Sequence, residues 1–323
     1  MAKPFKILSL DGGGIRGVIP AVVLSELESR LPQSIGETFD LIAGTSTGGI
    51  LALGLTKPGA DEKPQFSAEE LVDLYAKHGK RIFSRSIFHR VRAIGNAVEE
   101  KFSADALEDV LDEYLGDARL SSAVTDVLVP AYEIESRQAW FFSRAKALEN
   151  PQENDFTMKE VARATSAAPT YFEPARLEAQ GVPDYWALID GGVFANNPAM
   201  CAVTEALDTH KADELIVVSL GTGSQTRRIR YEDATGWGLV RWARPILDVV
   251  FDGVSDTVEH QVRQICRTTE EVERHYRFQP RLDIANDDLD DASPANIHAL
   301  KLQATQLVNE SKDKLDKLVE ALS

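Results

Sequence analysis

Three short glycine-containing segments hold residue types that could carry out acyl transfer. The first is the pentapeptide 44–48 (GTSTG), which stands between a strand-like apolar run and a helix-like apolar run. A nucleophile elbow needs this setting, because a sharp turn exposes the serine hydroxyl at the end of a sheet and small neighbours, here Gly44 and Gly48, avoid clashes. An ordinary serine cap in a glycine turn would have the same residues. We interpret Ser46 as a candidate nucleophile.

The second segment, residues 11–17 (DGGGIRG), also lies between a predicted strand and a predicted helix. Three consecutive glycines, Gly12, Gly13 and Gly14, cost backbone entropy, so they indicate a tight path or a close approach of the backbone to a ligand. Free amide groups at a helix N-terminus can bind an oxyanion. The segment predicts an oxyanion hole, to which Arg16 could add charge unless it pairs with a structural carboxylate.

The same segment also fits the dinucleotide-binding pattern G-x-G-x-x-G through Gly12, Gly14 and Gly17. That pattern expects an acidic residue at the end of the second strand, about 20 residues further on, to bind the ribose. Here Glu37 falls in a loop and Asp40 lies at the start of the strand. A nucleotide-binding oxidoreductase therefore stays as an alternative, although the sequence lacks the acidic residue that would bind the ribose.

The third segment is Asp190-Gly191-Gly192, which follows the apolar run WALI. A carboxylate at the C-terminal end of a strand lies where ligands meet open α/β sheets. Alone, it would fit a turn-initiating aspartate equally well. Together, the three segments supply a nucleophile, a base and an anion hole.

A conventional triad would add a histidine after the aspartate in the chain. None of the downstream histidines follows a glycine-rich strand end: we expect one at the end of a helix and two in charged, helix-like stretches. They are His210, His260, His275 and His298. The sequence therefore favours a Ser–Asp pair over a triad.

The elements that must position these residues alternate between strand and helix. Residues 5–10 and 39–44 are strand-like, and each leads through a glycine turn into an apolar helix. Two successive units of this kind favour a three-layer α/β fold with a mostly parallel central sheet flanked by helices. Further strands are expected at 127–133, 138–143, 186–190 and 214–220.

Capping residues predict where several helices begin. Ser67 with Glu70 predicts a helix through about His78, and Thr157 with Glu160 predicts another. A further helix is expected from about 104 to 115, and the pair Asn197-Pro198 predicts one with asparagine as its cap. The tail from about 294 to 322 reads as one charged amphipathic helix. We expect residues 1–323 to form a single domain.

Composition narrows the classes of function. With 43% hydrophobic and 27% charged residues the chain should form a globular core. A net charge of −16 makes nucleic acid an unfavourable partner. Cys201 and Cys266 are too few for a disulfide framework or a metal cluster, and we expect buried free thiols. No signal-peptide core or membrane span is apparent, which predicts a cytoplasmic protein.

Two segments could contact a membrane or act as a lid. Residues 80–92 are basic and include the apolar side chains Phe83, Ile87 and Phe88, and residues 236–251 combine Trp237, Trp242, Leu247 and Phe251 with two arginines. Simpler interpretations are a solvated face for the first segment and a core-facing helix for the second.

The ordered set of motifs resembles the patatin-like phospholipase family. DGGGIRG is similar to its oxyanion motif, GTSTGG to its nucleophile elbow and DGG to its catalytic aspartate motif. Residues 164–174 (ATSAAPTYFEP), 195–198 (ANNP) and 247–261 resemble further family stretches, so the similarity runs from about Phe5 to His260. One departure is the absence of the secretory signal of plant storage patatins, which puts a vacuolar storage role in doubt.

The resemblance implies a serine acyl hydrolase of the phospholipase A or lipid esterase type that needs no cofactor or metal. Ser46 would be the nucleophile, Asp190 the base, and the Gly12–Gly14 amides the oxyanion hole, with Arg16 in the motif's basic position. The expected partner is a lipid or other ester, with transient contact to a membrane surface. A small-ester carboxylesterase with the same Ser–Asp pair remains the main alternative.

Overall fold

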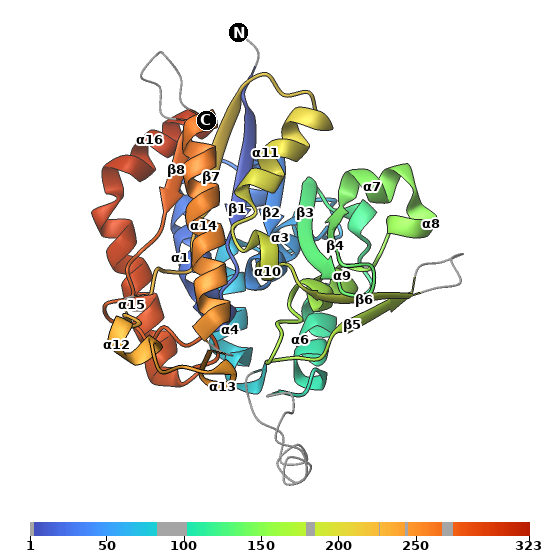
Figure 1. Cartoon of the computed structure of the whole chain (residues 1–323). Helices are drawn as coiled ribbons and strands as arrows, with labels where there is room; N and C mark the ends of the chain where they lie inside the picture. Colours follow the sequence, from blue (N-terminus) through green and yellow to red (C-terminus); the bar gives the residue numbers. More distant parts are fainter. Residues whose placement is uncertain (1–2, 83–101, 179–184, 226, 243–244, 267–273) are drawn as a thin grey trace.

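The central feature of the computed structural model is one mixed sheet (Figure 1). The model describes residues 3–82, 102–178, 185–225, 227–242, 245–266 and 274–323. The strands follow the order β5-β6-β3-β2-β1-β7-β8, and β4 pairs with β3 off this path. The strands are β1 (Phe5–Leu10), β2 (Leu41–Gly44), β3 (Asp126–Glu133), β4 (Gln138–Ser143), β5 (Ala175–Glu178), β6 (Tyr185–Asp190), β7 (Leu215–Leu220) and β8 (His275–Phe278).

The middle of the sheet is parallel and one side is antiparallel. Strands β3, β2, β1, β7 and β8 run parallel to their neighbours in this series, whereas β4 and β6 are antiparallel to β3, and β5 is antiparallel to β6. The predicted α/β class with a mostly parallel sheet is confirmed. The short strand β8 was not predicted, and it places His275 in a strand rather than in a helix-like stretch.

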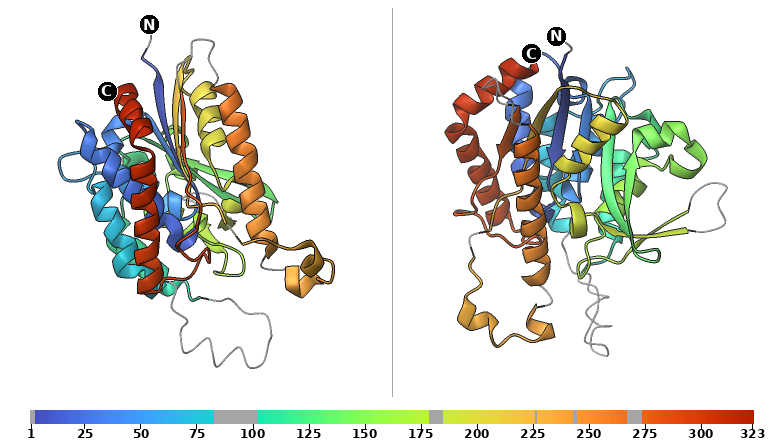
Figure 2. Two further views of the ribbon diagram at one scale, coloured as in Figure 1. Left: turned by 90° about the vertical axis from the view of Figure 1, so that its left-hand side faces the viewer. Right: turned by 45° about the horizontal axis from the view of Figure 1, so that its top comes forward.

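Helices cover both faces of the sheet (Figure 2, left). Alternate residues of the strands enter two separate cores: Leu8 and Ile42 face one side, and Ile7 and Leu41 the other. The first face carries α1 (Val18–Arg30), α3 (Thr47–Thr56), α4 (Ala68–Ile82), α6 (Asp105–Leu115), α9 (Met158–Thr165), α15 (Pro294–Glu310) and α16 (Lys312–Leu322). The second face carries α11 (Ala199–Asp208) and α14 (Pro245–Ile265).

Short helices complete the elements. They are η1 (Gly14–Gly17), α2 (Ile35–Thr38), η2 (Leu120–Ser122), α7 (Arg144–Glu149), α8 (Pro151–Asn154), α10 (Gly192–Ala195), α12 (Tyr231–Ala234) and α13 (Leu239–Trp242). All ten residues of α3 are buried, as its uniformly apolar sequence predicts. No helix in the described part of the chain is both long and apolar enough to cross a membrane.

Several predicted boundaries need correction. The tail is two helices, because Ser311 leaves the helical conformation (φ −101°, ψ 16°) between α15 and α16. The helix capped by Ser67 continues to Ile82. Helix α11 begins at Ala199, one residue later than expected, although the Asn197 side chain accepts its first amide at 3.0 Å as predicted.

Two further expectations concern exposure. Cys201 and Cys266 are free thiols, but both are only half-buried. Residues 236–251 do not form a core-facing helix throughout, since Leu239 and Val240 are both 92% exposed. The other segment with a predicted membrane or lid role, 80–92, lies outside the described residues from position 83 onward.

Candidate active site

Ser46 stands at a strained turn between β2 and α3. It is the N-cap of α3, with φ 55° and ψ −123°, a conformation that costs a non-glycine residue energy. The neighbouring glycines make this turn possible. A Cβ on Gly44 would lie 2.0 Å from the Gly48 oxygen, and one on Gly48 would lie 2.2 Å from the Leu10 oxygen. The spacing of the GTSTG motif is therefore a steric requirement of the turn.

Side chains from other elements hold this turn in place. The Ser46 amide donates to Thr165 Oγ1 at 2.9 Å, and the Thr165 hydroxyl donates to the Pro130 oxygen at 2.6 Å. The Thr45 hydroxyl donates to the Ala195 oxygen at 2.6 Å. On the other side, the Tyr75 hydroxyl lies 2.6 Å from Thr47 Oγ1. These contacts fix the direction of the Ser46 side chain.

Asp190 meets this serine from the antiparallel side of the sheet. Asp190 is 2% exposed, its carboxylate accepts the Gly192 amide at 2.7 Å, and it lines the same pocket as Ser46. Burial raises the pKa of Asp190 to about 7, against the opposing effects of the Ser46 side chain and the Gly192 amide. The carboxyl group is therefore far more basic than a free aspartate and titrates near neutral pH.

Asp190 ends a strand, as expected, but this strand does not belong to the parallel series. Strand β6 is antiparallel to β3, and Asp190 pairs with Ala131. Strand β3 extends past the end of β2, since Ala43 of β2 pairs with Leu128 and β2 ends at Gly44. Strand β6 therefore approaches from beyond the end of β2 and stops beside it.

The glycine turn after β1 lies against the same site. The Gly12 amide donates to the Asn196 oxygen at 2.9 Å, and the Gly12 oxygen accepts the Thr222 hydroxyl at 2.7 Å. The Gly12 amide is therefore engaged by protein, which differs from the prediction that it helps to bind an oxyanion. The Gly13 and Gly14 amides have no acceptor among the described residues, and both glycines line the pocket that contains Ser46.

Arg16, the fourth residue of the predicted oxyanion hole, does not line this pocket. It is 4% exposed, its Nε donates to the Gly13 oxygen at 3.4 Å, and it forms no ion pair within the described ranges. Burial lowers the pKa of Arg16, while the charges of Asp252 and Asp248 act in the opposite direction. Arg16 supports the glycine turn from behind.

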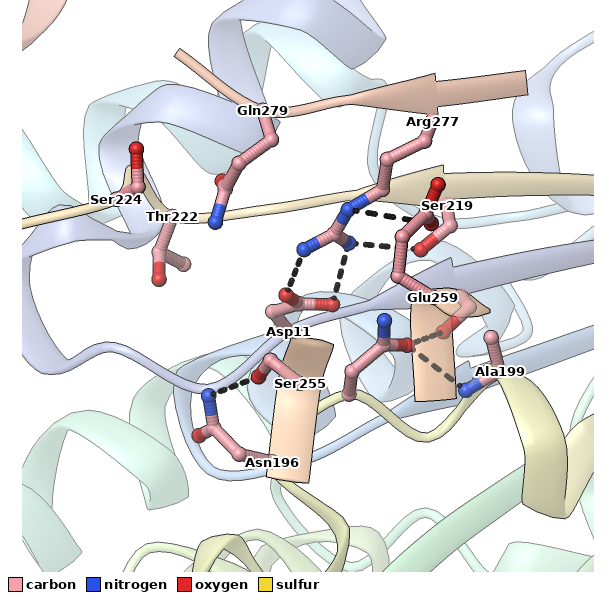
Figure 3. A network of polar contacts seen from close by, with 12 residues as sticks. Asp11, Asn196, Ala199, Ser219, Thr222, Ser224, Ser255, Glu259, Arg277 and Gln279 are labelled. Carbon is pink, nitrogen blue, oxygen red and sulfur yellow. Dashed lines mark hydrogen bonds and ion pairs between the residues drawn. The ribbon is translucent and has the colours of Figure 1, made fainter. Parts of the chain in front are cut away.

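A buried ion pair holds the start of the glycine turn (Figure 3). Arg277 of β8 binds the Asp11 carboxylate through two hydrogen bonds of 2.9 and 2.6 Å, and it donates to the Ser219 hydroxyl at 2.8 Å. Nearby, the Asn196 side chain donates to Ser255 of α14 at 3.2 Å. The turn is thus tied to β7, β8 and α14.

Sequence reasoning missed four of these supporting residues. Thr165 and Asn196 lie in segments that resemble family stretches, so the sequence offered a signal for them. Thr222 and Arg277 carried none.

The pocket around Ser46 has about 720 Å³ of unfilled space, part of it open to solvent. Most of its wall is apolar: Ile50, Leu74, Tyr75, Ile82, Leu107, Tyr171, Phe172, Phe251 and Leu289 line it together with Ser46, Asp190 and the glycine turn. None of the described histidines lines it. In the described part of the chain, no three His, Cys, Asp or Glu side chains are grouped so that they could hold a metal ion.

Comparisons with known proteins find sequence relatives over most of the chain. The model of the family described as patatin-like phospholipase matches residues 8–203. Patatin-like protein 3 of Arabidopsis thaliana is 36% identical over 79% of this chain and 69% of its own length. Patatin-like protein 2 of Oryza sativa subsp. indica is 30% identical over 97% of this chain and 86% of its own.

Two solved structures are more distantly similar. Human GIVD cytosolic phospholipase A2 has 10% identity and a TM-score of 0.48, with 99% of this chain and 60% of that chain covered. VipD from Legionella pneumophila has 13% identity and a TM-score of 0.44, with 96% and 67% covered. Those scores are too low to add to the sequence matches. The family model and the curated relatives together establish that this chain belongs to the patatin-like phospholipase family.

Proposed function

We propose that this protein is a lipid acyl hydrolase in which Ser46 is the nucleophile and Asp190 the general base. The observation that carries the proposal is that Ser46 and the buried Asp190 carboxyl line one pocket, where burial raises the pKa of Asp190 to about 7 and the Ser46 side chain opposes that rise. A base that titrates near the working pH accepts a proton and returns it with similar ease. A serine hydroxyl needs such a base to become an effective nucleophile.

In the first step, Asp190 takes the hydroxyl proton as Ser46 Oγ forms a bond to the ester carbonyl carbon. The carbonyl oxygen becomes an oxyanion, which the Gly13 and Gly14 amides stabilise. The intermediate collapses, the ester C–O bond breaks, and the leaving alcohol takes the proton from Asp190. The fatty acyl group remains on Ser46 as an ester.

In the second step, water attacks this acyl-enzyme. Asp190 takes a proton from the water, a second tetrahedral oxyanion forms at the glycine turn, and its collapse breaks the bond to Ser46 Oγ. Ser46 regains a proton from Asp190, and the fatty acid leaves. One carboxyl group serves both steps, so no histidine is required.

The walls of the pocket favour an acyl chain over a small polar ester. Ile50, Leu74, Ile82, Leu107 and Phe172 lie on elements that surround the space beside Ser46. An apolar chain placed there leaves water and gains about 0.8 kcal/mol for each buried CH₂ group. We therefore expect activity to rise with acyl length before it levels off.

The test measures hydrolysis of p-nitrophenyl butyrate and release of fatty acid from phospholipid vesicles. We expect Ser46→Ala and Asp190→Asn each to lower kcat at least about 1,000-fold on both substrates. Ser166→Ala is the matched control, because Ser166 lines the same pocket but its hydroxyl has no hydrogen-bond partner in the described structure. We expect this control to keep at least roughly 10% of the parent activity. Near-normal turnover by either dyad variant would overturn the assignment.

A further inference from the structure

A second feature of the molecule lies outside the pocket: a projecting segment that exposes large apolar side chains. We call residues 227–242, which include α12 and α13, the arginine rim. Leu239 and Val240 are 92% exposed and Tyr231 is 79% exposed, more than any other large apolar residue described. Figure 2 shows the rim standing away from the body, and Figure 1 places α12 and α13 at the end of the molecule where the parallel strands finish. Such exposure serves a binding surface better than it serves folding.

The charge of the rim is opposite to that of the whole chain. The rim has four arginines and two carboxylates, whereas the protein carries a net charge of −16. Arg227 pairs with Asp287 and Asp288 at 3.3 and 3.4 Å. The other three arginines are exposed and form no ion pair with any described residue: they are Arg228, Arg230 and Arg241. Their positive charge is available to an external anion.

Shared lining residues join the cavity under the rim to the pocket of Ser46. A cavity with about 1500 Å³ of unfilled space, part of it open to solvent, lies under the rim, and Tyr171 and Leu289 line both this cavity and the pocket. Along α14, Leu247 lines the outer cavity and Phe251, one turn later, lines the inner pocket. An acyl chain that enters at the rim can therefore reach the site past Tyr171, Leu247 and Leu289, while charged side chains line much of the rest of the outer cavity.

We propose that the arginine rim docks this enzyme on the surface of a lipid bilayer that contains anionic lipids. Leu239, Val240 and Tyr231 enter the boundary between headgroups and acyl chains, and the unpaired arginines bind lipid phosphates. This proposal rests on the proposed function, because docking serves an enzyme whose substrate is a lipid of the bilayer. Docking places the outer cavity against that bilayer.

A second copy of the chain is a poorer occupant of this surface. In a two-fold symmetric dimer the same patch from both copies would meet, so the unpaired arginines of one copy would face those of the other. Like charges at such close range oppose association. A bilayer with anionic lipids supplies both the apolar phase and the opposite charge.

Binding can be measured without turnover. The Ser46→Ala protein would be sedimented with vesicles of phosphatidylcholine alone and with vesicles of phosphatidylcholine and phosphatidylglycerol in equal parts. We expect tighter binding to the second kind, weakening as salt rises. Leu239→Asp/Val240→Asp should weaken binding at least about tenfold. Arg228→Gln/Arg241→Gln should weaken binding to the anionic vesicles alone, by about fivefold per arginine.

The matched control is Leu148→Asp/Leu207→Asp, which adds the same charges at exposed leucines of α7 and α11, away from the rim. We expect this control to bind as the parent does. Failure of the parent to bind either vesicle would overturn the proposal, as would equal loss in the control and the rim variant. A change from dimer to monomer in the rim variant, measured by sedimentation velocity, would instead assign the rim to a second copy and so overturn docking on lipid.

Failure of docking and failure of the proposed chemistry give different results. If the dyad is wrong, Ser46→Ala hydrolyses esters normally, whatever its binding to vesicles. If docking is wrong, binding by the rim variant is unchanged and its ratio of vesicle to nitrophenyl-ester hydrolysis equals that of the parent. We expect this ratio to fall at least about tenfold in Leu239→Asp/Val240→Asp with Ser46 intact.

Discussion

Glycines and arginines occur both in the floor of the candidate site and in the arginine rim, but their surroundings are opposite. By the floor we mean the turns around Gly14 and Ser46 with the ion pair of Asp11 and Arg277. On the floor, glycines allow backbone segments to touch, and Arg277 is buried against Asp11 by two hydrogen bonds. On the rim, Gly236 and Gly238 would have no atom within 4 Å of an added Cβ, and Arg227 is 60% exposed in its ion pair. The floor is fixed by close backbone contacts and a buried ion pair, whereas the rim glycines are open and its ion pair is exposed.

This difference assigns separate tasks to the two regions. Donors for an oxyanion must be aimed before the reaction begins, so the floor needs a turn that cannot relax. A surface that meets a fluid bilayer needs exposed apolar and basic side chains, and it gains little from a rigid backbone. Matched substitutions in the two regions should therefore differ in their effect on stability and on hydrolysis.

The largest difference is expected between the two ion pairs. Arg277→Met leaves the buried Asp11 carboxylate without its partner, and we expect this to lower the free energy of unfolding by about 3 to 5 kcal/mol. Arg227→Met breaks an exposed ion pair and should change the free energy of unfolding by less than about 1 kcal/mol. Denaturant unfolding at pH 8 checks both. The double variant Asp11→Asn/Arg277→Met should recover part of the loss, and equal effects in the two regions would remove the distinction.

A smaller difference is expected between glycines. Gly14 has φ +56°, and a Cβ there would lie 2.2 Å from the backbone oxygen of Leu289, which cannot move aside alone. We expect Gly14→Ala to cost about 2 kcal/mol of stability, and to lower kcat about 100-fold because it turns an oxyanion donor. Gly238→Ala should leave both unchanged. The measurement is kcat for a nitrophenyl ester on folded protein. A normal kcat in Gly14→Ala would contradict this prediction.

The third expected effect on stability has the opposite sign. Burial raises the pKa of Asp190 above its unfolded value, so the folded state binds more protons than the unfolded state between about pH 4 and pH 7. Stability is therefore lost as the pH rises through that window. We expect Asp190→Asn, which does not titrate, to be more stable than the parent by about 1 to 3 kcal/mol at pH 8, with little difference at pH 4.

Thermal unfolding at both pH values measures this effect. If Asp190→Asn is instead less stable than the parent at pH 8, the carboxylate is not penalised by burial, and its role as a base with a raised pKa fails with it. Activity supplies an independent check. The kcat/KM of the parent enzyme should rise with pH and level off above about 7, as the base loses its proton.

Local patterns predicted the parts of the site that each lie within one short segment. The strand, turn and helix around Ser46 follow from an apolar run, two glycines and a second apolar run, and Asp190 follows from WALI and two glycines. Those patterns also predicted the central parallel strands. They depend on steric and hydrophobic requirements of neighbouring residues, which a sequence displays directly.

The remaining parts depend on distant segments. Arg277 binds Asp11 across 266 positions of the chain, and no local pattern connects them. The Gly12 amide looked free in sequence, but the Asn196 main-chain oxygen occupies it. Leu239 and Val240 fit a core helix as well as an exposed one, because periodicity does not say whether another element covers a face. Only the packed fold decides these points.

The most direct test of the central claim is to label the nucleophile. The protein would be treated with an alkyl fluorophosphonate, which reacts with activated serines, and the adduct located by peptide mass spectrometry. We predict one adduct, on Ser46, with loss of ester hydrolysis in proportion, and labelling at least about 100-fold slower in Asp190→Asn. An adduct on Ser166 or elsewhere, or a labelling rate that Asp190→Asn leaves unchanged, would contradict the account.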